Sequence, residues 1–534
     1  MDFQKTIKYA ENIKPWLSWL LVIIFFLSIA YFANFRSSNV YDPDSFYHIR
    51  HSWIYGERGL FYSEFPWAQY SVIQELKADL WYGFHMFLLP FTYFGDLGLG
   101  IKVAGFTTTF LVLFSFYLAL KNLSVIFPAV WSSLFIFSSP LILYRMAMTR
   151  PHPLSLALFV LIFSFLIRGP LWLIPVLGFL TAWLHSALFW FPLVIFSVIL
   201  IFKTAGSQKV EATKFIALVA GLAVGLFARP NPLANLKLIY IQIVELYLSK
   251  KEVLEQVIGG ELRPPGYKEV EIYALFLLAV LTAAAGLLGW VIYKKEAMSP
   301  EARTAVLGSL TMVFVSIFMY MNANRALDIL AAFIIIFSAA VASYFLSEIK
   351  KGRIHIFGQN FNMAVLLFGL FAVFMAYNSV SVSAKNFISG AKLRSAFQEP
   401  AVWLKENTNE GDIVFHLSWS QFPMLFFWNQ RNYYINGMDP IFLYAYDPRL
   451  YWKVFYMFNK DMAGLTCGFI NCGPDQIETV HSVLLNDFKA NYIFVRKTTN
   501  PRFREYLEFD EGRFKKVYEE GFSVIYKVQP LKPL

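Results

Sequence analysis

Charged residues are scarce in this chain of 534 residues, where Asp, Glu, Lys and Arg together make up 15%. An average soluble domain contains about 25%. Hydrophobic residues make up 57%, and many long stretches carry almost no charge. This composition excludes an ordinary soluble enzyme and indicates a membrane protein with several spans. The shortage of charge within the apolar stretches also argues against a transporter, because transporters place ionisable residues near the bilayer midplane.

Cysteine is nearly absent, since Cys467 and Cys472 are the only two. Their spacing is not that of a zinc site. In an oxidising compartment they could form one disulfide across a small loop, whereas two free thiols are equally compatible with the sequence.

A small-residue cleavage site is missing near Phe35, after the first apolar run. That run is therefore interpreted as an uncleaved anchor and not as a removed signal peptide. Repeats and low-complexity segments are also missing. The formal net charge of +10 is interpreted as cytoplasmic loops beside anionic lipid, so we expect no nucleic-acid partner.

Long apolar runs are what the sequence has in abundance, and they predict about eleven helical crossings at roughly 20 residues each. The runs are 16–34, 101–120, 125–144, 154–167, 171–183, 187–202, 215–228, 272–293, 304–321, 326–346 and 362–380. A shorter piece, 81–94, is better interpreted as re-entrant or interfacial.

Positive charge predicts the orientation of these crossings. With the N-terminus in the cytoplasm, most Lys and Arg residues of the short loops lie on the cytoplasmic side, as the positive-inside rule requires. This places the long loops 35–100 and 229–271 outside, together with the C-terminal region. We therefore predict a transmembrane domain over 1–380 and a soluble extracytoplasmic domain over 381–534.

The C-terminal region has the pattern of a mixed α/β domain. Residues 400–407 and 476–488 are predicted helices. Strands are predicted at 412–417, 432–435, 492–495 and 523–528.

Polar residues gather directly after the first apolar run, in the stretch VYDPDSFYHIR at 40–50. Asp42, Asp44, His48 and Arg50 at a lipid-water boundary indicate that a metal, a phosphate or a proton is handled there. A solvated loop is the alternative interpretation.

Two further outer-face positions carry similar chemistry. RMAMTRPHP at 145–153 contains Arg150 and His152, and GGELRPP at 259–265 contains Glu261. A carboxylate can bind a divalent cation or act as a general base, while Arg or His neutralises a departing phosphate. Glu261 could equally be a solvated loop residue, and His85 is interpreted as a packing residue.

This arrangement resembles the catalytic subunit of oligosaccharyltransferases and, more broadly, the GT-C class of polyprenol-dependent glycosyltransferases. DSFYHIR at Asp44–Arg50 is similar to the pattern that follows the first span in archaeal members. Glu261 followed three residues later by Pro264 is similar to their re-entrant outer loop. Arg325 matches an outer-face arginine, and AVWLKENTNEGDIVF at Ala401–Phe415 is similar to the start of their soluble domain.

The sequence also departs from that family. Arg150 stands where archaeal members carry the aspartate of an Asp-x-His motif, and HLSWSQF at 416–422 replaces a Trp-Trp-Asp element. Trp419 alone matches a residue of that element, which in the family recognises the acceptor sequon. Both metal binding and sequon recognition are therefore altered.

The resemblance implies a GT-C fold and a membrane glycosyltransferase. It would move a sugar or an oligosaccharide from a polyprenyl phosphate or pyrophosphate to a protein, lipid or glycan acceptor outside the cytoplasm. Asp44 and Glu261 are the expected catalytic residues, Arg150, His152 and Arg325 the donor-phosphate ligands, and Trp419 the acceptor-binding residue. A Mg²⁺ or Mn²⁺ ion held by Asp42, Asp44 and His152 is one expectation, and weakened metal dependence is the other. The alternative function is a lipid or glycolipid flippase without transferase activity.

Overall fold

The computed structural model describes residues 14–206, 211–249, 260–293, 298–350, 358–388, 390–459, 464–498 and 501–530. The chain divides into two compact units, each made from separate parts of the sequence. Unit 1 comprises Met1–Tyr41, Lys102–Leu226 and Ile258–Ala391. Unit 2 comprises Asp42–Ile101, Phe227–Val257 and Lys392–Leu534.

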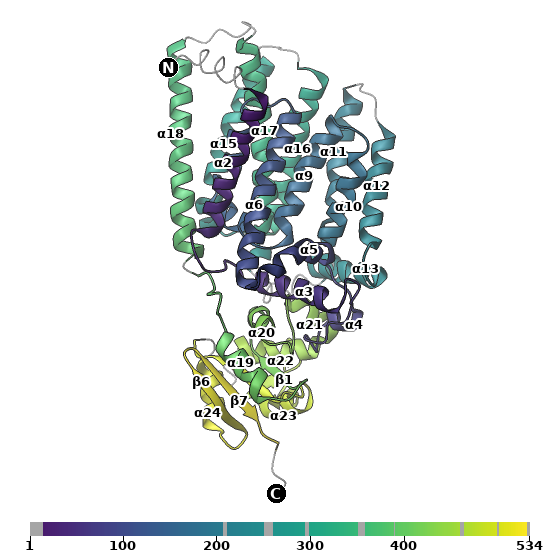
Figure 1. Cartoon of the computed structure of the whole chain (residues 1–534), viewed down its shortest axis with the longest axis vertical. Coiled ribbons are helices and arrows are strands. Elements are labelled where there is room, and N and C mark those ends of the chain that lie inside the picture. Colours follow the sequence, from purple (N-terminus) through teal and green to yellow (C-terminus); the bar gives the residue numbers. More distant parts are fainter. Residues whose placement is uncertain are drawn as a thin grey trace. The chain divides into compact units, whose positions relative to one another are not determined.

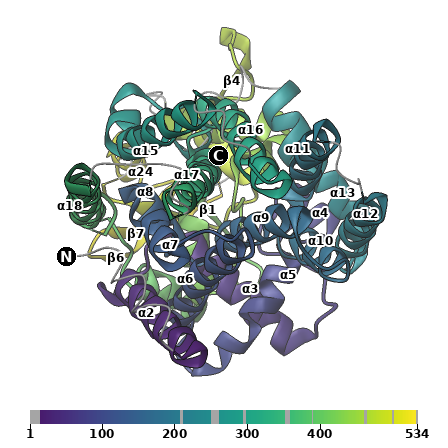
Figure 2. The same ribbon diagram turned by 90° about the horizontal axis from the view of Figure 1, so that it is seen from above.

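Unit 1 is a bundle of apolar helices that run side by side (Figures 1 and 2). Several of them begin with proline, whose fixed φ and missing N–H suit the first turn of a helix. The longer helices are α2 (Pro15–Phe35), α6 (Leu97–Asn122), α7 (Pro128–Phe137), α9 (Pro151–Ile167), α10 (Leu173–Leu184), α11 (Phe191–Ala205), α12 (Ala212–Phe227), α15 (Tyr267–Tyr293), α16 (Pro300–Asn322), α17 (Leu327–Lys350) and α18 (Gly358–Ser383). The short ones are α8 (Pro140–Met146), η2 (Ser186–Leu188), η4 (Gly260–Leu262), η5 (Asn324–Ala326) and η6 (Ala384–Ile388).

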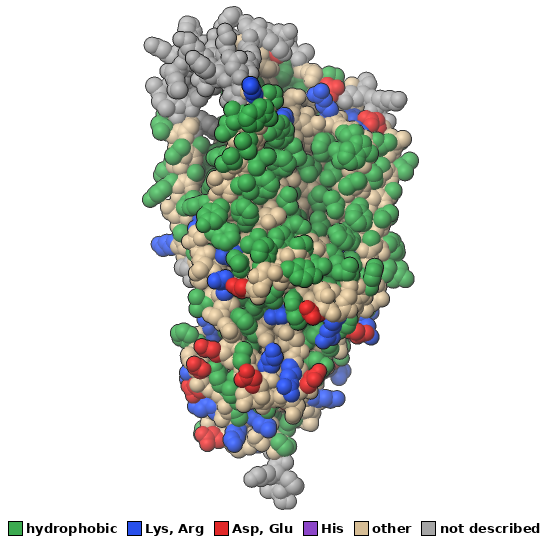
Figure 3. All heavy atoms as spheres, in the orientation of Figure 1, with side chains coloured by type: hydrophobic (Ala, Val, Ile, Leu, Met, Phe, Trp, Pro, Cys, Tyr) green, Lys and Arg blue, Asp and Glu red, His purple; other side chains and the backbone are tan. Residues whose placement is uncertain are grey.

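Helix α17 forms the core of this bundle. It packs against α7, α9, α15 and α16, which surround it in Figure 2. By contrast, α2 presents Leu20, Leu21, Ile24 and Phe25 at the surface, and hydrophobic side chains cover most of the visible face of the bundle (Figure 3). An apolar outer surface of this extent is what a lipid-facing bundle requires.

The structure contains several helices that could cross a membrane, as predicted, but it does not confirm the predicted number of crossings. Within the described residues, six helices are long and apolar enough to cross a membrane, or up to eight if each bent pair counts as one span. The bent pairs are α7 with α8, at 99°, and α12 with the helix that begins at Pro232, at 104°. Helices α9 and α10 are apolar but shorter. The chain is an integral membrane protein, and the count of eleven stays a prediction.

Unit 2 combines a five-stranded sheet with helices. The strand order is β2-β1-β5-β7-β6, in which β2, β1 and β5 are parallel and β7 and β6 are antiparallel. The strands are β1 (Ile413–His416), β2 (Tyr433–Tyr434), β5 (Tyr492–Arg496), β6 (Phe514–Glu520) and β7 (Ser523–Val528), and β3 (Leu465–Cys467) pairs with β4 (Ile477–Thr479) in a separate ladder. The predicted strands are confirmed, while the predicted helix at 476–488 is wrong in its first part, because residues 477–479 form β4.

Helices from all three parts of the sequence complete unit 2. They are α3 (Asp44–Arg58), α4 (Val72–Leu76), α5 (Tyr82–Leu88), η1 (Leu89–Phe94), α13 (Pro232–Tyr240), η3 (Ile241–Ser249), α19 (Gln398–Asn407), η7 (Trp419–Gln421), α20 (Phe422–Trp428), α21 (Pro440–Tyr446), α22 (Pro448–Asn459), η8 (Pro474–Gln476), α23 (Val480–Asn486) and α24 (Pro501–Phe509). The short apolar piece predicted at 81–94 is α5 followed by η1. The predicted loop at 229–271 contains α13, η3 and η4, and its residues 250–259 lie outside the described part.

The first outer segment joins the sheet of the C-terminal region. The backbone N–H of Tyr434 donates to the carbonyl of Trp67 at 2.9 Å, and the N–H of Gln69 donates to the carbonyl of Tyr434 at 2.9 Å. Residues 67–70 therefore cover the edge of β2, which would otherwise expose unpaired backbone groups. This pairing fixes the segment that carries α3 and α5 against the sheet.

Candidate functional site

The predicted site residues of unit 1 come together around one carboxylate. Glu261 in η4 lies with its Oε2 3.3 Å from Nη1 of Arg150 and 3.2 Å from Nη1 of Arg145. Arg150 immediately precedes α9, and Arg145 lies in α8. The segment from α8 to the start of α9 thus brings two guanidinium groups to Glu261, which lies 111 residues after Arg150.

A buried ion pair lies next to this arrangement and positions Arg145. Nε of Arg145 donates to both carboxylate oxygens of Asp328, at 3.0 and 2.8 Å. The Arg145 and Asp328 side chains are only 4% and 6% exposed. A buried charge is costly unless it is paired, so each of these two side chains requires the other. Their ion pair links α8 to α17. Sequence reasoning did not assign a role to either residue, since only the fold reveals that they pair.

Arg325 and His152 complete the group, which we call the arginine cluster: Arg145, Arg150, His152, Glu261, Arg325 and Asp328. Arg325 lies in η5, where the backbone N–H of Asn324 donates to the carbonyl of Arg263 at 2.9 Å and ties η5 to the loop of Glu261. Nε2 of His152 lies 3.8 Å from Asp328 Oδ2. Four of the sequence-predicted residues, Arg150, His152, Glu261 and Arg325, therefore share one site.

Electrostatics in the arginine cluster keep Glu261 ionised. Burial alone would raise the pKa of Glu261, but the charges of Arg150, Arg145 and Arg325 outweigh it and lower the pKa to about 2. The side chain is still 42% exposed, so solvent screens these interactions and we derive no stability from them. What distinguishes Glu261 from a solvated loop residue is its pairing with the guanidinium groups of Arg145 and Arg150.

Unit 2 carries the other predicted residues, with Asp42 and Asp44 at the start of α3 and Trp419 in η7. Asp42 is buried and accepts hydrogen bonds from the backbone N–H and the hydroxyl of Ser45, both at 3.2 Å, and so supports the first turn of α3. Asp44 is the first residue of α3 and is partly exposed. The predicted ion site of Asp42, Asp44 and His152 draws on both units and stays a prediction.

Arg50 and Trp419 occupy different settings in unit 2. The guanidinium of Arg50 lies between the rings of Trp53 and Phe427, 4.8 and 5.1 Å from their centroids. Burial lowers the pKa of Arg50 to about 10, so it remains charged at neutral pH. Trp419 begins η7 and is partly exposed, beside the capping box of Ser418 and Gln421. Its predicted role in acceptor binding remains a prediction.

The histidines of α3 belong to a buried polar group that sequence reasoning did not anticipate. Nδ1 of His48 lies 2.8 Å from Nε2 of His85, and Nδ1 of His85 lies 2.6 Å from Asp79 Oδ2. His85, interpreted from sequence as a packing residue, is indeed fully buried but is also hydrogen-bonded at both nitrogens. The signal available in the sequence was the spacing of His48 and His51, which share one face of a helix.

Fold comparison agrees with the resemblance noted in the sequence. No family model and no curated protein matches the chain by sequence. Among solved structures, the archaeal oligosaccharyltransferase AglB from Archaeoglobus fulgidus matches with a TM-score of 0.58 at 12% identity, over 96% of this chain and 74% of AglB. The arabinofuranosyltransferase AftD from mycobacteria matches with a TM-score of 0.53 at 13% identity, over 97% of this chain and 40% of AftD. The chain therefore has the fold of these two glycosyltransferases.

Proposed function

We propose that this protein transfers a sugar or an oligosaccharide from a polyprenyl phosphate or pyrophosphate donor to an acceptor outside the cytoplasm. The arginine cluster of unit 1 is the observation that carries this proposal. The AglB structure contains a dolichol phosphate and an inhibitory peptide, which are a lipid phosphate and a peptide ligand of the kinds required here.

The charge of the arginine cluster suits a phosphate. Three guanidinium groups, from Arg145, Arg150 and Arg325, face two carboxylates, from Glu261 and Asp328. The cluster therefore has an excess of one positive charge. Arg150 and Glu261 are partly exposed, so a ligand can reach the cluster beside them. Arginine binds phosphate oxygens through paired N–H donors, and such contacts stabilise a leaving phosphate.

The transfer step needs a base for the acceptor. In the proposed reaction the bond from the sugar C1 to the phosphate oxygen breaks, and a bond from C1 to the acceptor atom forms. The acceptor proton passes to the carboxylate of Asp44, and the negative charge of the departing phosphate is stabilised by Arg150, His152 and Arg325. Glu261 positions the arginines and the acceptor, and Trp419 packs against the acceptor.

The arginine cluster does not fit the divalent cation that the family resemblance implies. The Nη1 of Arg150 lies 3.3 Å from the Oε2 of Glu261, so the carboxylate of the cluster already has a positive partner. A guanidinium so close would repel Mg²⁺ or Mn²⁺, and it already supplies positive charge for the phosphate. We therefore assign no step of the reaction to a metal at this site.

The disulfide of unit 2 supports an orientation of the C-terminal region outside the cytoplasm. Cys467 in β3 is bonded to Cys472, five residues later. Disulfides persist in oxidising compartments and are rare in the cytosol. This agrees with the excess of Lys and Arg predicted for the opposite side of the membrane.

The decisive experiment removes the Arg150 side chain. Purified protein in detergent is given a labelled polyprenyl-linked sugar, and both lipid-phosphate binding and sugar transfer are measured. Arg150→Ala is expected to reduce transfer by about 10²-fold, because it removes one charged contact to the leaving group. Arg168→Ala is the matched control, since Arg168 follows the other end of α9 and lies near Ser124.

Three outcomes separate the possible functions. Equal transfer by the Arg150→Ala and Arg168→Ala variants would contradict the assigned role of the arginine cluster. Lipid-linked sugar that crosses a proteoliposome membrane without transfer to any acceptor would identify a flippase. Loss of transfer in Asp44→Asn with lipid-phosphate binding intact would support Asp44 as the base.

Metal dependence provides an independent prediction. We expect transfer to continue after removal of Mg²⁺ and Mn²⁺ by a chelator, because Arg150 supplies the charge that a cation would provide. The measurement is the transfer rate against chelator concentration. Full loss that is restored by Mg²⁺ or Mn²⁺ would contradict this prediction and favour an ion held by Asp42, Asp44, His152 and Glu261.

A further inference from the structure

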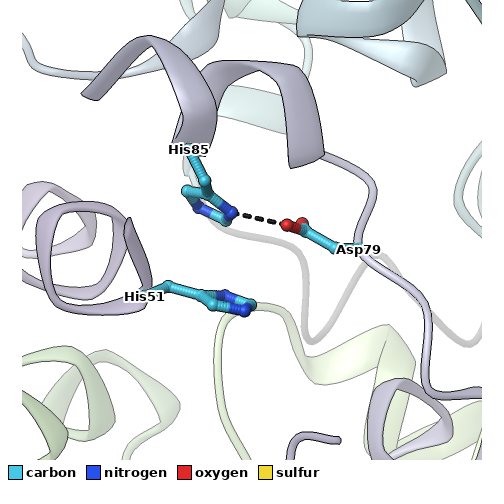
Figure 4. Close-up of side chains that lie close together, drawn as sticks. All are labelled: His51, Asp79 and His85. Atoms are coloured by element: carbon cyan, nitrogen blue, oxygen red, sulfur yellow. Dashed lines mark hydrogen bonds and ion pairs between the residues drawn. The ribbon is translucent and has the colours of Figure 1, made fainter. Parts of the chain in front are cut away.

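A second group of potential metal ligands lies in unit 2. The group consists of His51 in α3, Asp79 in the segment before α5, and His85 in α5. Each residue offers one ligand atom, and these atoms all lie within 4.8 Å of one another. Figure 4 shows the two imidazole rings and the carboxylate pointing toward one another from three different segments. Among the described residues this is the one group of three such side chains gathered at this spacing.

Neighbouring side chains hold each of the three in place. The hydroxyl of Tyr47 lies 2.9 Å from His51 Nδ1, which leaves His51 Nε2 for a ligand. The backbone N–H of Trp81 donates to Asp79 Oδ1 at 2.9 Å, and the hydroxyl of Tyr55 donates to Asp79 Oδ2 at 3.0 Å. Metal-binding residues in proteins are oriented by outer partners of this kind.

His48 determines which nitrogen of His85 can bind an ion. Nε2 of His85 lies 2.8 Å from His48 Nδ1, and Nδ1 of His85 lies 2.6 Å from Asp79 Oδ2. If the His85 proton lies on Nε2 and is donated to His48, Nδ1 presents a lone pair beside Asp79. An ion would then replace the short contact between His85 and Asp79, and their separation would widen to about 3.3 Å, as bond lengths near 2.0 Å and tetrahedral geometry require.

The surroundings favour an ion that binds nitrogen. Tyr47, Phe65 and Trp81 pack around the group, with the Tyr47 ring 5.8 and 6.0 Å from the rings of Phe65 and Trp81. Two imidazoles and one carboxylate suit Zn²⁺ and its neighbours in the transition series more than Mg²⁺ or Ca²⁺, which prefer oxygen ligands.

A small pocket lies beside His51 and Asp79. Its lining also includes Tyr55, Phe65, Lys77 and Pro230. The pocket can supply a water as the fourth ligand, which a site with three protein ligands requires.

We propose that His51 Nε2, Asp79 Oδ2 and His85 Nδ1 bind one Zn²⁺-class ion with a water as the fourth ligand. The ion joins α3 to the segment before α5 and thereby stabilises unit 2. This site goes beyond the proposed transferase function and does not depend on it, because none of the three residues is assigned to the transfer reaction.

The test measures metal binding by the full-length protein in detergent, without any activity assay. After treatment with a chelator, the protein is dialysed against Zn²⁺ or Co²⁺, and bound metal is counted by elemental analysis. We expect one equivalent per chain, a higher unfolding temperature with Zn²⁺, and the strong visible absorption of tetrahedral Co²⁺ with nitrogen ligands. His51→Gln and Asp79→Asn are each expected to weaken binding by at least about tenfold.

His416→Gln is the matched control. His416 is also a buried histidine of unit 2, but its ring nitrogens contact the backbone carbonyls of Ser418 and Asn436. This variant is expected to keep one equivalent of metal.

Two results would overturn the proposal. One is folded wild-type protein that binds no Zn²⁺ or Co²⁺ above background. The other is unchanged stoichiometry and Co²⁺ spectrum in both His51→Gln and Asp79→Asn. If these variants do not fold, the Co²⁺ spectrum of the wild-type protein tests the proposal by itself. A weak spectrum typical of octahedral oxygen coordination, or no Co²⁺ spectrum at all, would contradict a tetrahedral site with nitrogen ligands.

Discussion

Glu261 lies in η4 with its carboxylate between the guanidinium groups of Arg145 and Arg150. Its pKa of about 2 lies below the ordinary value, so any stability from these pairs is present above the unfolded pKa. That contribution declines as the pH falls below the unfolded pKa and is lost once the pH has fallen through about 2. Between pH 5 and 8 Glu261 stays charged, and the pH profile of transfer in this range must arise from other groups.

Removal of the Glu261 charge should separate donor binding from transfer. In Glu261→Gln the arginine cluster gains one unit of net positive charge, so lipid-phosphate binding is expected to tighten by roughly threefold to tenfold. Transfer is expected to fall, because the acceptor and Arg150 lose the group that positions them. Binding is measured with a labelled polyprenyl phosphate, and Glu271→Gln on the exposed face of α15 is the control. Weaker phosphate binding by Glu261→Gln would contradict this account.

At this scale the sequence allowed the polar residues to be named but not their partners. Arg150, His152 and Glu261 stood out as polar residues of the predicted outer loops, and Arg325 stood out through the resemblance to the family. Arg145 and Asp328 have the same character, yet their pairing depends on two helices that are 183 residues apart in sequence. The same holds for Asp79, whose partners His51 and His85 are known only once α3 and α5 are packed together.

Glycines determine how closely two helices of unit 1 approach. A Cβ at Gly178 of α10 would lie 2.8 Å from the carbonyl oxygen of Leu218 in α12, and a Cβ at Gly221 of α12 would overlap the backbone of Pro175 in α10. Small residues at such positions let helix backbones pack closely in membranes.

A single added methyl group tests this packing. Gly221→Ala is expected to destabilise the protein by about 1–3 kcal/mol, because the backbones must move apart. Gly286→Ala is the control, since a Cβ at Gly286 in α15 meets nothing within 4 Å. The control is expected to be neutral or to stabilise by up to about 1 kcal/mol, as alanine favours a helix. Thermal unfolding in detergent is the measurement, and equal unfolding temperatures for the two variants would contradict the packing argument.

Elements with strong patterns were predictable, and those set by tertiary contacts were not. The apolar runs and the strands β1, β5 and β7 stand out because their composition alone favours them. Helix α13 lay hidden in a predicted loop, since its polar residues mask its periodicity. β4 was predicted as helix, although Ile477–Thr479 are extended because they pair with β3.

At the scale of the whole molecule, the Cys467–Cys472 bond tests the proposed orientation, because disulfides persist in oxidising compartments and are rare in the cytosol. Protein extracted from membranes in the presence of a thiol-alkylating agent should therefore carry no label after unfolding, and both cysteines should become labelled after reduction. Cys467→Ser with Cys472→Ser is expected to cost about 2 kcal/mol, since the closed loop is short. Labelling of both cysteines before reduction would place this region in a reducing compartment.

The pairing of residues 67–70 with β2 sets an order for biosynthesis. Residues 42–101 leave the ribosome early, but their partners begin at Lys392, so they wait through the synthesis of almost 300 residues, on the order of tens of seconds. During that delay the aromatic side chains around Tyr47 have no sheet or α20 to cover them. A newly made chain therefore leaves these side chains uncovered until translation has passed Lys392, and a shortened chain that lacks the last 143 residues, counted from Lys392 to Leu534, would leave them uncovered permanently.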